Sequence, residues 1–224
     1  MYARCKRCKR ETEWTLMIWF AWQVSDSGYR CVDGVLYANS ATKAQALACL
    51  REEFAESICL EFANLDVTPE HVSEFAGRFG LLKGPADQSE SIAIWEQEVA
   101  SIRAVLSISA SGDSERATLK YAEGWSRQSG VEASYSPNAH KSGLEFRCVP
   151  RDFSSWLWLQ LGQTLRDRKV GRCKQCNVLF FKGGGKGRRR AQSRSTKQFC
   201  TVECKVTFNN SVSKERRQSI PNAS

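Results

Sequence analysis

The sequence is poor in two features that many enzymes and membrane proteins need. Histidine occurs only twice, as His71 on an expected helix and His140 in a polar loop, and neither pairs with a recognisable nucleophile. Long apolar runs are also missing, since the longest, TLMIWFAWQV at 15–24, is half the roughly 20 residues of a membrane span. We therefore expect no catalytic residues, no enzyme activity and no membrane insertion.

A convincing secretory signal is missing as well. The apolar run follows CKRCKR, as in a signal peptide, but no small-residue cleavage site follows it, and Gln23 and Asp26 come too early. This pattern predicts a cytoplasmic protein. In such a reducing compartment, closely paired cysteines more often bind metal, and scattered ones more often lie in the core.

The chain contains ten cysteines, and their spacing separates them into three groups. Cys49, Cys59 and Cys148 fall in apolar patterns and are expected in the core. Cys5 and Cys8 form a lone CxxC whose nearest third ligand would be Cys31, which is a weak metal signal. The remaining four make two close pairs near the C-terminus.

Charge is divided unevenly along the chain. Residues 166–217 contain 16 Lys and Arg against 3 acids, a net charge of +13, and residues 1–10 add +5. The middle, 11–165, carries −9. An acidic body with a strongly basic end is typical of a module that meets a polyanion.

Apolar periodicity predicts an α+β fold that is predominantly α-helical. Aromatic and β-branched residues at 14–24 and 30–38 predict a pair of strands, and 144–149 a further short strand, whereas 129–143 resembles a loop. Glutamates such as Glu96 and Glu98 are expected on solvated helix faces. Helical stripes, several with N-capping residues or a terminal glycine, occur at 41–65, 68–80, 89–108, 113–125 and 152–168.

The same composition suggests how the chain is divided. We expect a basic N-terminal segment, an acidic and mainly helical domain, a four-cysteine domain with a basic loop, and a short tail, over 1–10, 11–168, 169–217 and 218–224. The boundary near 168–171 is where an amphipathic helix gives way to Cys, Gly and Arg.

The C-terminal cysteine pairs have the spacing of a zinc site. Cys173 and Cys176 are separated by two residues, so a tight turn can aim both at one ion. Cys200 and Cys204 are separated by three, which puts both on one face of a helix capped by Thr201. Four thiolates fill a tetrahedral Zn²⁺ site and leave no position for water, so the spacing predicts a structural zinc ion.

This segment resembles the treble-clef zinc finger of the bacterial CGNR family. The likeness rests on C-x2-C, an aromatic strand, a basic stretch and F-C-x3-C opening a basic helix, over about fifty residues. FAGRFGLL at 75–82 and the Trp95 helix are loosely similar to the helical ABATE-like N-terminal part of that family. The resemblance implies a stress-related transcription regulator that binds DNA, although Cys204-Lys-Val-Thr replaces the Cys-Gly-Asn-Arg signature.

The segment between the pairs, GGGKGRRR, does not fit a phosphate-binding loop. No Ser or Thr follows Lys186, and Phe180 stands where the first glycine of a Walker A motif belongs. Two readings stay open: a flexible solvated loop, or a basic arm that grips nucleic-acid phosphates. The arm would comprise Lys182, Lys186, Arg188, Arg189, Arg190, Arg194 and Lys197.

The final helix is the second candidate for phosphate contacts. Lys205, Asn209 and Arg216 share one face of it, which fits either a nucleic-acid groove or a solvated surface. Phe180, Phe181 and Phe199 are expected to form a small core beside the zinc rather than to stack on bases.

These observations favour a zinc-containing, non-catalytic nucleic-acid-binding protein, with DNA ahead of RNA. The larger domain would sense a signal, form a homo-oligomer or bind a protein partner. The alternative from another class is a protein-interaction module, in which zinc is purely structural and the basic surface meets an acidic partner, for example the chain's own −9 region.

Overall fold

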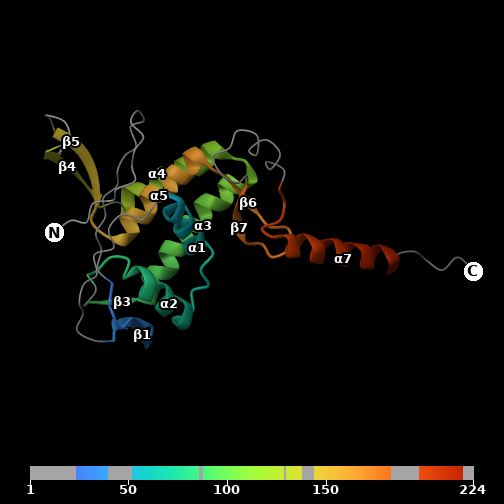
Figure 1. Cartoon of the computed structure of the whole chain (residues 1–224), viewed down its shortest axis with the longest axis horizontal. Coiled ribbons are helices and arrows are strands. Elements are labelled where there is room, and N and C mark those ends of the chain that lie inside the picture. Colours follow the sequence, from blue (N-terminus) through green and yellow to red (C-terminus); the bar gives the residue numbers. More distant parts are fainter. Residues whose placement is uncertain are drawn as a thin grey trace, which may run out of the picture.

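The computed structural model describes most of the chain and has a mixed α+β fold in which helices hold most of the described residues (Figure 1). This confirms the predicted fold class. The predicted features at 14–23, 40–51, 86–87, 138–143 and 183–196 lie outside the described residues. The described residues are 24–39, 52–85, 88–128, 130–137, 144–182 and 197–218.

The helices follow the predicted stripes closely. In the described part of the chain they are α1 Glu52–Ala63, α2 Pro69–Phe79, α3 Ile92–Ser111, α4 Ser114–Gln128, α5 Phe153–Asp167 and α7 Val202–Gln218. None of them is both long and apolar enough to cross a membrane, as far as the described residues extend.

Helix α2 illustrates how local sequence sets the boundaries. Thr68 accepts a hydrogen bond from the His71 N–H at its N-terminus, Pro69 occupies the first turn, and Gly80 ends the helix with φ 81°. A φ in that range strains any residue with a Cβ, so glycine suits the stop. The stripe predicted from periodicity is buried: Val72, Phe75, Ala76 and Phe79.

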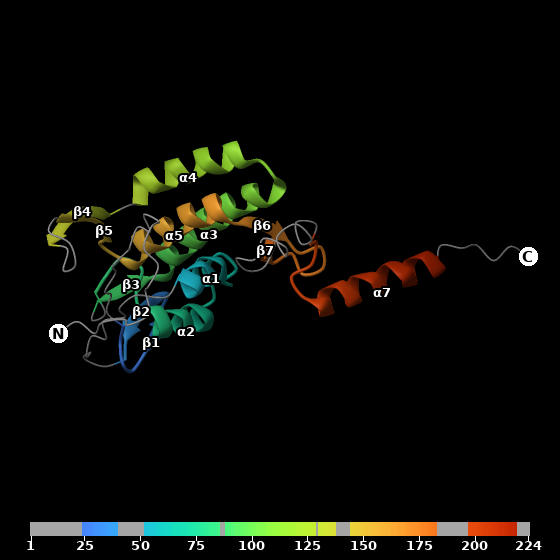
Figure 2. The ribbon, with the colours of Figure 1, turned by 45° about the horizontal axis from the view of Figure 1, so that its top comes forward.

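Helix α3 forms the centre of the core and lies against α1, α4, α5 and strand β6 (Lys169–Arg172) (Figure 2). Its predicted stripe is buried, with Trp95, Ile102 and Leu106 fully enclosed. Trp95 contacts Phe62 of α1 and Phe75 of α2 with ring centroids 6.0 Å apart in both pairs.

One buried residue of α3 contradicts its prediction. Glu98 was expected on a solvated face but is 2% exposed, because a set of donors surrounds it. Trp158 Nε1 donates to Glu98 Oε1 over 2.7 Å, the Ser154 hydroxyl donates to the same oxygen, and Lys83 Nζ lies 2.9 Å from the Ser154 oxygen. A carboxylate can be buried when such hydrogen bonds replace water.

The first predicted strand pair was partly wrong. Residues 30–38 do not form one strand but turn back as a hairpin of β1 (Tyr29–Val32) and β2 (Val35–Ala38). Asp33 and Gly34 make the turn with φ 50° and 76°, so the Asp-Gly pair was the missed signal. Strand β3 (Ser89–Ser91) pairs with β2, which moves the start of α3 to Ile92.

The predicted loop at 129–143 was also wrong. Strand β4 (Val131–Pro137) pairs antiparallel with β5 (Leu144–Pro150) from Val131↔Pro150 to Pro137↔Leu144. Val131, Ala133 and Tyr135 alternate with polar residues, which is a strand pattern, but the prediction was a loop because serine and other polar residues dominate the stretch. The hairpin lies at one end of the molecule, and α7 extends from the other (Figures 1 and 2).

Candidate metal centre

The first cysteine pair lies on a hairpin that is joined to the helical body. Strands β6 and β7 (Leu179–Lys182) pair antiparallel, and Val170 and Leu179 belong to the main apolar core. Asn64, just after α1, exchanges two 2.9 Å hydrogen bonds with the backbone N–H and C=O of Leu179. The hairpin therefore has a fixed place on the body, because its strand is held by core packing and by a paired side-chain amide.

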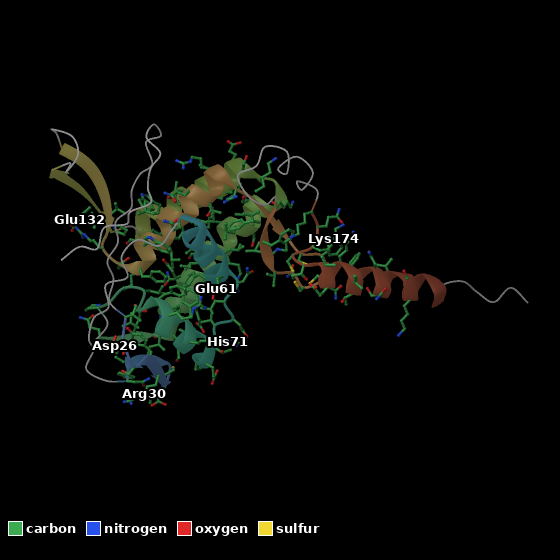
Figure 3. All side chains as sticks on the ribbon, in the orientation of Figure 1. Asp26, Arg30, Glu61, His71, Glu132 and Lys174 are labelled. Atoms are coloured by element: carbon green, nitrogen blue, oxygen red, sulfur yellow. The ribbon has the colours of Figure 1, made fainter. Side chains whose placement is uncertain are left out.

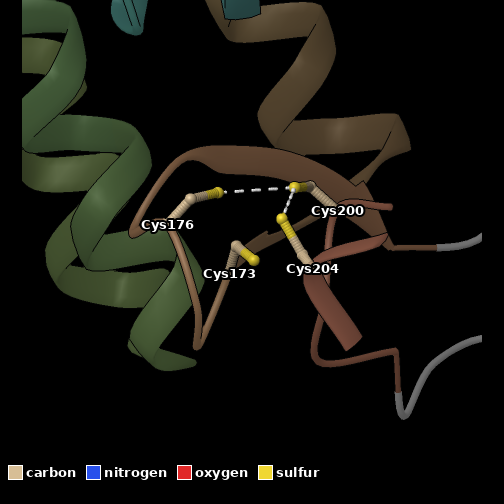
Figure 4. Close-up of side chains that lie close together, drawn as sticks. All are labelled: Cys173, Cys176, Cys200 and Cys204. Carbon is tan, nitrogen blue, oxygen red and sulfur yellow. Dashed lines mark hydrogen bonds between the residues drawn. The ribbon is translucent and has the colours of Figure 1, made fainter. Parts of the chain in front are cut away.

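The turn between β6 and β7 holds Cys173 and Cys176 in a tight knuckle. Cys173 N–H donates to the Val178 carbonyl over 2.9 Å, and Asn177 N–H donates to the Cys173 carbonyl over 3.0 Å. Asn177 has a φ of 61°, a left-handed conformation that asparagine tolerates better than most residues. This turn aims both thiols to the same side (Figure 4).

The second pair comes from the start of α7. Thr201 caps the helix by accepting a 3.2 Å hydrogen bond from the Cys204 N–H, as predicted. Cys200 precedes the helix, Cys204 lies in its first turn, and both sulfurs point to the knuckle (Figure 4). A 3.1 Å bond from Lys174 N–H to the Gln198 carbonyl ties the two halves of the site together.

The four predicted ligands thus form one cluster. The sulfurs of Cys173, Cys176, Cys200 and Cys204 all lie within 4.8 Å of one another, and this group can hold a metal ion. Two Sγ–Sγ distances, Cys176 to Cys200 and Cys200 to Cys204, are 3.5 Å (Figure 4). A disulfide needs about 2.05 Å, so these are free thiols.

Hydrogen bonding and crowding oppose each other within the cluster. Burial acts to raise the pKa of Cys173, but N–H groups of Cys176, Cys200 and Gln175 donate to its sulfur and lower it to about 6. Burial and the neighbouring thiols raise the pKa of Cys200 to about 12. The first thiolate is therefore favoured by donors, while further ones need a positive charge nearby.

Basic side chains surround this cluster. Lys197 Nζ donates to the Cys200 carbonyl over 2.9 Å and lies 5.3 Å from the centroid of the Phe180 ring. Arg172 donates to the Asn177 carbonyl over 3.0 Å and to the Ser107 hydroxyl of α3. Lys174, labelled in Figure 3, is exposed on the knuckle itself.

The predicted phosphate-binding residues fall into three groups. Lys182 ends β7, Lys197 lies beside Cys200, and Lys205 is exposed on α7. Arg216 belongs to α7. The rest of the predicted arm lies outside the described residues: Lys186, Arg188, Arg189, Arg190 and Arg194.

The aromatic residues behave as predicted for a small core. Phe180 is 6% exposed, Phe181 packs on the main core, and Phe199 contacts Phe208 of α7 with ring centroids 5.3 Å apart. The contacts from Asn64 and Ser107 were not predicted. They depend on long-range packing that no local motif signals.

No protein-family model and no curated protein matches the chain. Membership of the CGNR family therefore stays a prediction from the cysteine motif.

Of the cysteines outside the cluster, Cys59 is buried between α1 and α5 as predicted, with its sulfur 3.9 Å from the Leu157 carbonyl. Cys31 lies half-buried in β1 and Cys148 belongs to β5, while Cys5, Cys8 and Cys49 are outside the described residues.

Proposed function

We propose that the four cysteines bind one structural Zn²⁺ ion and that the basic C-terminal end of the chain binds nucleic acid, with DNA as the expected partner. The zinc would fix the start of α7 against the β6–β7 hairpin. Transcription regulation, and a sensing or association role for the helical domain, extend this proposal through the CGNR resemblance.

The donor set and its spacing support zinc. Tetrahedral coordination at about 2.3 Å separates sulfurs by about 3.8 Å, and the observed range from 3.5 Å up to 4.8 Å brackets that value. Four thiolates are soft ligands that suit zinc, and they leave no open position. The formal charge of −2 on such a centre is balanced by neighbours such as Lys174 and Lys197.

The exposure of the basic end is the observation that carries the nucleic-acid proposal. Helix α7 extends away from the acidic body (Figures 1 and 2). Among the described residues, none of the lysines at 174, 182, 197, 205 and 214 makes an ion pair with a carboxylate. The exposed charges of Lys205 and Lys214 on α7 are therefore open to phosphates, which favours nucleic acid over the rival in which the basic surface docks on the chain's own acidic domain.

Binding of a short DNA duplex across a salt series tests the proposal. We expect the full-length, zinc-loaded protein to bind with an affinity that falls steeply as salt rises. Lys205→Gln should lower the affinity for every sequence and reduce the log–log salt slope by about 1. Lys120→Gln is the matched control, because this exposed lysine lies on α4 and pairs with Glu123 over 3.1 Å. Absent binding, or binding indifferent to salt, would refute the proposal.

A further inference from the structure

Helix α7 is only lightly packed against the rest of the protein, as far as its side chains are described. It is 17 residues long, and from Val202 to Lys214 each side chain is at least partly exposed. Its side chains stand clear of the body in Figure 3. Protein helices gain most of their stability by packing an apolar face, so a helix that is exposed over most of its surface has room for a partner.

The least exposed positions of α7 define its inner side. Cys204, Phe208 and Val212 are the half-buried residues of the described helix, and they recur every four residues. Phe208 packs on Phe199 at a centroid distance of 5.3 Å. The inner side therefore belongs to the cysteine cluster.

The side next to the inner one carries an unusual mixture of residues, which we call the outer face: Val202, Lys205, Val206, Asn209 and Ser213. Helical spacing puts them along one side. Val202 is 71% exposed and Val206 51%, two of the most exposed large apolar side chains among the described residues. Asn209, Ser213 and Lys205 are exposed beside them.

We propose that the outer face of α7 lies in the major groove of B-form DNA and reads A·T base pairs. This deepens the proposed function and rests on it. Exposed valine methyls can contact the C5-methyl of thymine, and the amide of Asn209 can bond N6 and N7 of adenine. Lys205, at the edge of this face, is placed to contact a phosphate.

The shape and the side chains of α7 fit duplex DNA better than double-stranded or single-stranded RNA. The major groove of B-DNA is about 12 Å wide and admits an α-helix, whereas that of A-form RNA is too narrow. Single-stranded RNA is read largely by stacking bases on aromatic rings. Phe208 is the one aromatic residue between 202 and 214, and its ring packs on Phe199.

A thymine-to-uracil exchange tests this inference directly, because uracil lacks the C5-methyl and keeps the phosphates. The full-length protein is titrated with an alternating A·T duplex of roughly 20 base pairs, with the same duplex containing uracil, and with a single-stranded RNA of equal length. We expect the uracil duplex to bind roughly fourfold more weakly or worse, the value of one buried methyl contact.

Matched variants assign the effect to α7. Val206→Ser should weaken binding of the thymine duplex and abolish the thymine–uracil difference, and it changes helix propensity little. Leu119→Ser is the control, since Leu119 is 61% exposed on α4 and should leave the difference intact.

The outcomes separate this inference from the proposal beneath it. Salt-dependent binding that is equal for thymine and uracil duplexes, or stronger for single-stranded RNA, would overturn the major-groove inference and leave nucleic-acid binding standing. A thymine preference that survives Val206→Ser would also overturn it. Binding to none of the probes would overturn both.

Discussion

The described cysteines include a core residue, Cys59, and a candidate metal ligand, Cys173, and the groups around each sulfur account for the difference. Burial raises the pKa of Cys59 to about 12, so this residue is an inert apolar filler between α1 and α5. Cys173 is also buried, but backbone N–H groups surround its sulfur and lower its pKa to about 6. Backbone donors and the thiol of Cys176, rather than burial, make the difference.

Removal of one thiol should therefore release the metal. We expect Cys176→Ser to lower zinc affinity by more than the 10–100-fold that loss of an outer-shell partner costs. The measurement is zinc per chain after dialysis against a weak chelator. Cys59→Ala is the matched control, since the Cys59 thiol is free and lies in the core, outside the cluster. Equal zinc content in the two variants would contradict the assignment of ligands.

At the scale of elements, α4 and α5 approach each other over two glycines. A Cβ on Gly124 would lie 2.0 Å from the Trp158 ring, and one on Gly162 would lie 2.5 Å from the Tyr121 hydroxyl. Trp158 in turn donates to the buried Glu98 of α3. The close crossing thus positions the tryptophan whose N–H satisfies a buried carboxylate.

This crossing predicts opposite effects for two glycine substitutions. Gly124→Ala should destabilise the protein by about 1–3 kcal/mol, because the Trp158 ring cannot move without losing its bond to Glu98. Gly77→Ala, also within a helix, meets nothing within 4 Å and should stabilise by about 0.5–1 kcal/mol. Chemical denaturation of both variants measures the difference, and a stabilised Gly124→Ala would refute the packing argument.

Much of the element scale could be predicted from the sequence, because helix signals are local. The cap at Thr68, the stop at Gly80 and the stripe of α3 each depend on a few neighbouring residues. Strand β4 was missed although its residues alternate, because its polar composition is also typical of a loop. The burial of Glu98 could not be predicted, since it depends on Ser154 and Trp158. Distant partners leave no local pattern.

The candidate site divides in the same way. Two short cysteine spacings were enough to predict the cluster, because each pair is fixed by a local turn or cap. The hydrogen bonds that attach the β6–β7 hairpin to the helical body were not predicted, since Asn64 and Leu179 are 115 residues apart. The exposure of α7 was left open between a groove and a solvated face, because polar helix sequences are compatible with both.

On the scale of the whole molecule, the cysteine cluster stands between two regions of different charge. The helical body belongs to the −9 part of the chain, and the cluster lies within the +13 segment. The β6–β7 hairpin shares the core of the body, while α7 extends from the opposite side of the cluster (Figure 1). A metal ion there would join the folded core to the basic helix.

The most direct test of this account is the affinity of the full-length protein for a short DNA duplex, measured by fluorescence anisotropy with zinc bound and after its removal by a chelator. Structural zinc contributes folding free energy, so its loss should release α7 and the ends of the basic stretch. We predict salt-dependent binding that weakens at least about tenfold without zinc and returns when zinc is restored. Binding of equal strength with and without zinc would contradict the account.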